Sequence, residues 1–180
     1  EFVRDEVLFY LESNFRTSPF ISLVGHGYSA NLITHFLQEN TAFINSFICI
    51  NPSFSDFIGR EFASYNLLKF RKEDNTFYFY SSNSNSFPAT KQKKIDQVQQ
   101  GLSALQIKNF NVINDVINTS NSVSALGEAI PRALTKVFEV YSGISKEEYE
   151  NLIPFDDDYE EKSSLIYHLI ILPGITVLIC

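Results

Sequence analysis

The residues of this sequence whose types and spacing could support chemistry lie at one glycine-rich turn. A short apolar run, Phe20–Val24, leads into Gly25-His26-Gly27-Tyr28-Ser29-Ala30, after which apolar residues recur at helical spacing. A strand, a sharp turn and a helix in this order are the context of the G-x-S-x-G pattern, in which a strained turn exposes a serine nucleophile. Gly25 and Ser29 take the flanking positions of that pattern, and Gly27 stands where the serine would be.

Gly27 decides what this turn can do. Glycine adopts the strained backbone at less cost than serine, but it has no atom that could attack a carbonyl carbon. The alternative interpretation is an ordinary glycine-rich turn between a strand and a helix. Two other residues are weak substitutes for a missing nucleophile and base. Ser29 is expected in the first helical turn, and His168 lies in an apolar tail.

Metal-ligating residues are too few and too scattered for a site. The three histidines, His26, His35 and His168, form no cluster along the chain, and Cys49 and Cys180 cannot build a zinc site or a disulfide framework alone. The acidic run 156–161 lacks the ligand spacing and the turn glycine of a calcium loop. We therefore expect no metal and no cofactor.

Strand-like and helix-like patterns alternate along the chain, and these elements must position the turn. The predicted helices cover residues 2–14, 29–38, 61–70, 90–105 and 124–141, with a further short helix opening at 145–148. The predicted strands cover residues 20–24, 43–50, 75–80 and 108–112, and the third ends in a polar loop over 81–86. This alternation predicts an α/β protein with a mostly parallel sheet and helices on both faces.

Two further segments accompany the turn: Asn14-Phe15-Arg16-Thr17 precedes it, and Ile50-Asn51-Pro52-Ser53 follows one helix later. With them, residues 2–53 resemble the esterase D-like family of α/β-hydrolases, and a weaker similarity continues to Ala129–Leu134. The resemblance implies the C-terminal part of an α/β-hydrolase fold and a carboxylic ester hydrolase ancestry. It also implies that the backbone N–H of Tyr28 is an oxyanion-hole donor.

The resemblance further implies where an acid and a histidine should stand. The acid should follow the strand that ends at Tyr80, where residues 81–86 are only serine and asparagine. The family pattern His-x-Ser-Val matches residues 120–123, so that Ser120 takes the histidine position, and Asp115 is the nearest carboxylate. Nucleophile, acid and base are then all missing, which implies a catalytically inactive protein that is retained for binding or structure.

Two alternatives remain open at this point. The first is an active carboxylic ester hydrolase with a displaced triad that uses Ser29 and His168. The second is a purely structural domain whose pocket is filled by aromatic side chains, since the chain has 17 phenylalanines and 9 tyrosines. A small molecule or a protein is the expected kind of ligand, and the sequence does not indicate a compartment.

Composition narrows the class of protein. The chain has 180 residues, of which 44% are hydrophobic, enough for one globular core. A net charge of -7 disfavours a nucleic-acid partner. Residues 165–180 are apolar, but Pro173 and Gly174 interrupt them and they are shorter than the roughly 20 residues that a membrane-spanning helix needs.

The expected organisation is a partial hydrolase-like domain over 1–153, followed by an acidic segment and an apolar tail over 154–180. The chain begins without methionine inside a predicted helix, which is typical of a piece of a longer protein. Without neighbouring strands, the strand at 20–24 would expose a hydrophobic edge. The chain is therefore expected to express poorly by itself.

Overall fold

The computed structural model describes residues 2–38, 43–55, 67, 70, 75–84, 88–118, 121, 123–139 and 176–179. The chain divides into two compact units. One unit consists of Glu1–Arg16 and Phe138–Gly174, and the other consists of Thr17–Val137 and Ile175–Cys180. The second unit contains the sheet and the glycine-rich turn.

The sheet has five strands in the order β4-β3-β2-β1-β5, and every neighbouring pair is parallel. The strands are β1 (Ile21–His26), β2 (Ser46–Ile50), β3 (Phe77–Ser84), β4 (Phe110–Ile117) and β5 (Thr176–Ile179). In β1 and β2 almost every residue is buried, as expected for strands covered on both faces. This arrangement confirms the predicted α/β class and the parallel sheet.

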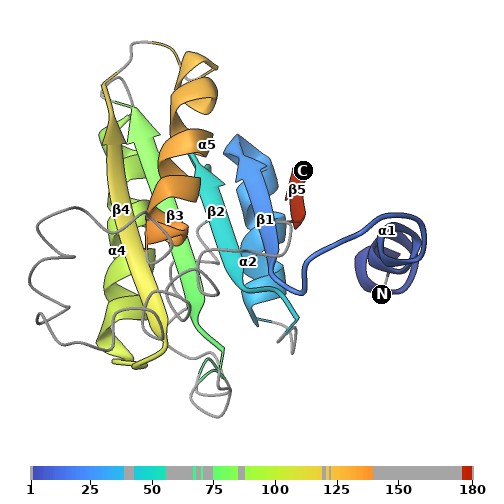
Figure 1. Ribbon diagram of the computed structural model, residues 1–180. Helices are drawn as coiled ribbons and strands as arrows, with labels where there is room; N and C mark the ends of the chain where they lie inside the picture. Colours follow the sequence, from blue (N-terminus) through green and yellow to red (C-terminus); the bar gives the residue numbers. More distant parts are fainter. Residues whose placement is uncertain are drawn as a thin grey trace, which may run out of the picture. The chain divides into compact units, whose positions relative to one another are not determined.

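Helices cover both faces of the sheet (Figure 1). Helices α2 (Ala30–Gln38) and α4 (Ala89–Ala104) lie behind the strands in the view of Figure 1, and α5 (Ser124–Val137) lies in front. In the other unit, Phe2–Leu8 forms a π-helical segment that continues into α1 (Phe9–Asn14). The prediction of a helix over 2–14 is therefore confirmed, and its first seven residues form a π-helix and not an α-helix.

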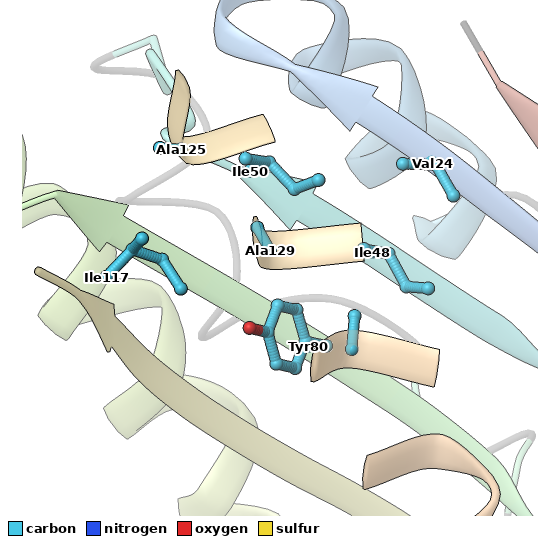
Figure 2. Close-up of a cluster of buried hydrophobic side chains, with 8 residues drawn as sticks. Val24, Ile48, Ile50, Tyr80, Ile117, Ala125 and Ala129 are labelled. Carbon is cyan, nitrogen blue, oxygen red and sulfur yellow. The ribbon is translucent and has the colours of Figure 1, made fainter. Parts of the chain in front are cut away.

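A row of small side chains lets α5 pack closely on the sheet (Figure 2). Ala125, Ala129 and Ala133 recur every four residues, so that they share one face of the helix, and all three are fully buried. They meet large side chains of four strands, namely Val24, Ile48, Ile50, Tyr80 and Ile117. Methyl groups facing larger side chains allow the two layers to interdigitate at the density of a protein interior.

Two strands differ from the sequence prediction. Ser81–Ser84 belong to β3 and not to a loop, because all four residues continue the parallel pairing with β4, the first two also pair with β2, and all four are buried. Strand β4 begins and ends later than the predicted 108–112. The error at Ser81–Ser84 has a physical cause: strand propensity follows side-chain type, whereas these polar residues are held in the sheet by backbone pairing with neighbouring strands.

The apolar tail contributes a strand. Strand β5 pairs with β1 along Ile21–Val24, so the prediction that this edge of β1 is exposed is wrong. The expectation of poor expression loses that support. Helix α5 ends at Val137 and not at Tyr141. The predicted helix opening at 145–148 lies outside the described residues, as does most of the predicted helix at 61–70. Within residues 61–70, the structure describes only Leu67 and Phe70.

No described helix is long and apolar enough to cross a membrane. The division of the chain at residue 153 stays a prediction.

A charged pair fixes α5 to the strands beneath it. The Arg132 guanidinium donates to both carboxylate oxygens of Asp115, from Nε at 2.7 Å and from Nη2 at 2.5 Å. The Tyr80 hydroxyl donates to the same carboxylate at 2.9 Å. Burial by itself would raise the pKa of Asp115, but the hydrogen bonds from Arg132 and Tyr80 outweigh it, so that this pKa is lowered. β3, β4 and α5 thus meet at one carboxylate.

We expect Asp115→Asn to destabilise the protein by about 1–3 kcal/mol at pH 7, because a charge-assisted hydrogen-bond pair is lost. The folded-state pKa of Asp115 is lowered, so its stabilising contribution is present above the unfolded-state pKa and disappears as the pH falls through the folded-state pKa. Urea unfolding of wild type and variant should therefore differ at pH 7 and converge in acid.

Glu128→Gln is the matched control for this measurement, since it removes the other carboxylate on Arg132, a solvent-exposed pair one helical turn away. Its effect should be much smaller and should vary little with pH. Equal losses for the two variants would contradict the proposed importance of Asp115.

Candidate functional site

The glycine-rich turn joins β1 to α2 at the carboxyl end of the sheet. β1 ends at His26, a single 3-10 turn covers Gly27–Ser29, and α2 begins at Ala30. Gly27 has a φ of +61°, in the left-handed region where a side chain strains the backbone. An added Cβ at Gly27 would meet no heavy atom within 4 Å. The position thus has room for a side chain, and the backbone conformation is what favours glycine there.

Gly25 is needed for a different reason. A Cβ on Gly25 would lie 2.8 Å from Cδ1 of Ile33 and 3.0 Å from the backbone carbonyl group of Ser29. The first turn of α2 therefore rests directly on the backbone of β1. This close approach makes the turn sharp, and it explains a glycine two residues before the apex in steric terms.

The hydroxyl of Ser29 holds the turn together. It accepts a hydrogen bond from the backbone N–H of His26 at 2.9 Å and donates to the carbonyl oxygen of His26 at 3.0 Å. His26 and Ser29 form a reciprocal capping box around this short helical turn. Because its proton goes to the backbone, Ser29 is placed as a cap and not as a group aimed outward from the sheet.

Tyr28 occupies the centre of the turn, and 79% of its surface is exposed to solvent. The role of its backbone N–H, directly after the apex, as an oxyanion-hole donor stays a prediction. Ser120 and His168, the other two candidate positions, lie outside the described residues.

Three hydrogen bonds tie the loop after β2 to the turn and to Asn31 of α2, and a fourth ties Asn31 to the turn itself. The backbone N–H of Ser53 donates to the carbonyl oxygen of Gly27 at 2.9 Å. The amide nitrogen of Asn31 bridges the carbonyl oxygens of Tyr28 and Ser53, at 3.1 Å to each, and its amide oxygen accepts from the N–H of Ser55 at 3.1 Å. The turn and the loop are therefore joined directly by backbone and side-chain hydrogen bonds.

The same loop is also tied to the end of β3. Asn51 has a φ of +43°, which asparagine tolerates better than most residues. Its N–H donates to the carbonyl oxygen of Ser82, and its side-chain oxygen accepts from the N–H of Ser84, both at 2.8 Å. Three neighbouring strand ends are thus linked through residues 51–55.

The carboxyl end of β3, where the resemblance places an acid, holds only neutral polar side chains. Between Asp74 and Asp96 the sequence has no acidic residue. Ser82 Oγ and Asn83 Oδ1 are buried without a hydrogen-bond partner within the described part of the chain. Asp115 lies on the next strand, where Tyr80 and Arg132 bind its carboxylate. Asp115 is therefore engaged in holding α5.

Asn31 and Lys91 were not singled out from the sequence, and Ser53 was named only as part of the segment that carries the resemblance. Lys91 donates from Nζ to the hydroxyl oxygen of Ser53 at 3.0 Å, which brings α4 to the loop beside the turn. One signal was available: Ser53 follows Asn51-Pro52 directly after a buried strand, and the carboxyl ends of parallel strands share one edge of the sheet. Within the described ranges, no group of three or more histidine, cysteine or acidic residues is close enough to hold a metal ion.

The parallel sheet, the helices on both faces and the strand-turn-helix at its carboxyl edge define an α/β fold, and this fold resembles about half of a chain described as a serine hydrolase. No protein-family model and no curated protein matches the sequence. The likeness is to solved structures, and it shows the fold alone.

One similar structure is an uncharacterised protein from Capnocytophaga ochracea DSM 7271, with a TM-score of 0.74 and 17% identity over 98% of this chain and 50% of that chain. Another is an IroE-like serine hydrolase from Shewanella oneidensis, with a TM-score of 0.62 and 13% identity over 96% of this chain and 56% of that chain. This chain therefore spans about half the length of both structures.

We expect Gly25→Ala to destabilise the protein by about 1–3 kcal/mol, because the new methyl group would force α2 away from β1. Gly127→Ala is the matched control. Gly127 lies within α5, where an added Cβ meets nothing within 4 Å. This change should be neutral or stabilise the helix by up to about 1 kcal/mol. Thermal or urea unfolding measures both, and a neutral Gly25→Ala would contradict the close approach.

Proposed function

We propose that this chain is an α/β-hydrolase-fold protein that does not catalyse through its glycine-rich turn and is retained for binding or structure. The single observation that carries the proposal is Gly27 at a φ of +61°, the apex of the turn, where an enzyme of this fold would need a nucleophilic side chain. A glycine there keeps the turn and offers no nucleophile.

Two further observations support the proposal. The Ser29 hydroxyl gives its proton to the carbonyl oxygen of His26, so the nearest serine in the turn is used as a cap. The connection that follows β3 has no carboxylate before Asp96, well inside α4. A triad needs a nucleophile, a base and an acid within hydrogen-bond reach of one another, and none of these observations favours such a set.

The alternative is an active carboxylic ester hydrolase with a displaced triad. The structural likeness to a protein described as a serine hydrolase favours it, since that protein shares the fold. It requires Ser29, or another serine, to be activated by a histidine such as His168.

Fluorophosphonate labelling distinguishes a catalytically inactive protein from an active hydrolase with a displaced triad. We expect no covalent adduct on the wild-type chain under conditions that label an authentic serine hydrolase fully, as measured by intact-protein mass spectrometry. An adduct on any serine would overturn the proposal. Turnover of a short-chain aryl ester that is abolished by Ser29→Ala would establish the displaced triad.

A second experiment places a serine at the apex. Gly27→Ser should fold, since an added Cβ meets no atom within 4 Å, at a cost of about 1–3 kcal/mol for the left-handed backbone. It should remain unlabelled, because a hydroxyl without a positioned base is a poor nucleophile at neutral pH. Rapid labelling of Gly27→Ser would mean that a competent base is in place and that only the nucleophile was lost.

A further inference from the structure

Strand β4 lies at one edge of the sheet, and its outer side is unpaired. Within the described residues, β4 pairs with β3 alone, over all eight positions from Phe110 to Ile117. Figure 1 shows β4 at the opposite end of the sheet from β5. The outer side of an edge strand presents a row of backbone N–H and C=O groups, and these can pair with another strand.

The pairing with β3 fixes which backbone groups of β4 point outward. The N–H of Phe77 on β3 donates to the carbonyl oxygen of Asn109 at 2.8 Å, so the odd-numbered residues of this segment bond to β3. Successive residues of a strand direct their N–H and C=O groups to opposite edges. The even-numbered residues Val112, Asn114 and Val116 therefore direct theirs outward.

The side chains of the same three residues are poorly covered. Asn114 is exposed, Val112 is half-buried, and 51% of the surface of Val116 is exposed to solvent. They lie on the face of the sheet where α4 packs, because the partner of Asn114 on β3 is Ser81, which accepts a hydrogen bond from Gln99 of α4. An apolar side chain thus stands in solvent beside unpaired backbone groups.

β4 lacks the features with which proteins protect an exposed edge. Residues 110–117 include no proline, lysine or glycine, and their register with β3 is unbroken, so that no bulge bends the strand away. The one charged residue, Asp115, is bound by Arg132 and Tyr80. The opposite edge differs, since β5 has only four residues and a short edge strand pairs poorly.

We propose that β4 pairs antiparallel with β4 of a second copy of this chain, with a twofold axis at Asn114. In this register Asn114 lies opposite its own copy, and Val112 lies opposite Val116 of the second copy. Each of these pairs joins two residues whose N–H and C=O groups point outward, so that each pair exchanges two backbone hydrogen bonds. Because both copies use the same surface, the contact closes as a dimer.

Side-chain chemistry favours a second copy as the partner. The two Asn114 amides can bind each other, since each has a donor and an acceptor, and the Val112–Val116 pairs cover the exposed apolar surface. The chain has a net charge of -7, but β4 brings no unpaired charge to the contact. In this register Asp115 lies opposite Ile113, whereas an axis at Asp115 would set two carboxylates against each other.

Sedimentation velocity of the full chain tests the dimer. We expect a shift from monomer to dimer as the concentration rises from about 1 to about 100 μM, because an interface built mainly from one strand is small. Val116→Lys should weaken dimerisation at least about tenfold, since a lysine on an edge strand opposes pairing. Leu32→Lys is the matched control: it adds the same charge at another exposed apolar position, on α2, which packs on β1 and β2. Its effect should be less than about twofold.

Cysteine cross-linking tests the register, in a chain that also carries Cys180→Ser. Opposite residues in a hydrogen-bonded antiparallel pair have Cα atoms about 5.5 Å apart, within the range that a disulfide spans. Asn114→Cys should therefore form a covalent dimer under mild oxidation. Asn111→Cys is the control, because Asn111 is exposed on the same strand but lies opposite Ile117 of the second copy. It should cross-link at least about tenfold more slowly.

Three results would overturn the inference. They are a wild-type chain that stays monomeric or forms open-ended aggregates, equal effects of Val116→Lys and Leu32→Lys, and equal cross-linking of Asn114→Cys and Asn111→Cys. Circular dichroism verifies that each variant is folded, which is expected because the substituted side chains are exposed. The fluorophosphonate result is independent of all three, so the dimer and the proposed loss of catalysis can fail separately.

Discussion

The approach of α2 to β1 at Gly25 is the contact on which the rest of the site depends. A Cβ there would lie 2.8 Å from the Ile33 side chain, so α2 packs against the backbone of β1 with no room for a side chain on Gly25. The chain must then reverse within three residues, which puts Gly27 in a left-handed conformation and turns the Ser29 hydroxyl back onto His26. The turn is therefore set by packing, independently of any chemistry at its apex.

Hydrogen bonds connect the turn between β1 and α2 to the neighbouring elements along the carboxyl edge of the sheet. Asn31 and Ser53 join the turn to the loop after β2, and Asn51 joins that loop to β3. Lys91 then brings in α4. Polar contacts at this edge thus replace the apolar packing that holds the middle of the sheet under α5. None of these contacts involves a side chain at position 27, so they do not depend on which residue stands at the apex.

Particular residues show which strands can be predicted from local sequence patterns and which cannot. The apolar runs that became β1 and β2 were recognisable because strands buried on both faces need apolar residues at nearly every position. Ser81–Ser84 were misassigned as a loop for the complementary reason: their polar side chains hide a central strand that is paired on both sides. The pairing of β5 with β1 joins residues more than 150 positions apart, which no local pattern encodes.

The sequence by itself determined the α/β class, the glycine at the apex and the absence of acidic residues between the end of β3 and Asp96, since these depend only on residue type and on periodicity along the chain. Tertiary structure decided the rest: that Gly25 is needed for a close approach, that the Ser29 proton goes to the backbone, and that Lys91 lies against Ser53. These are distances between residues on different elements, and they exist only once parallel strands have brought their carboxyl ends together at one edge.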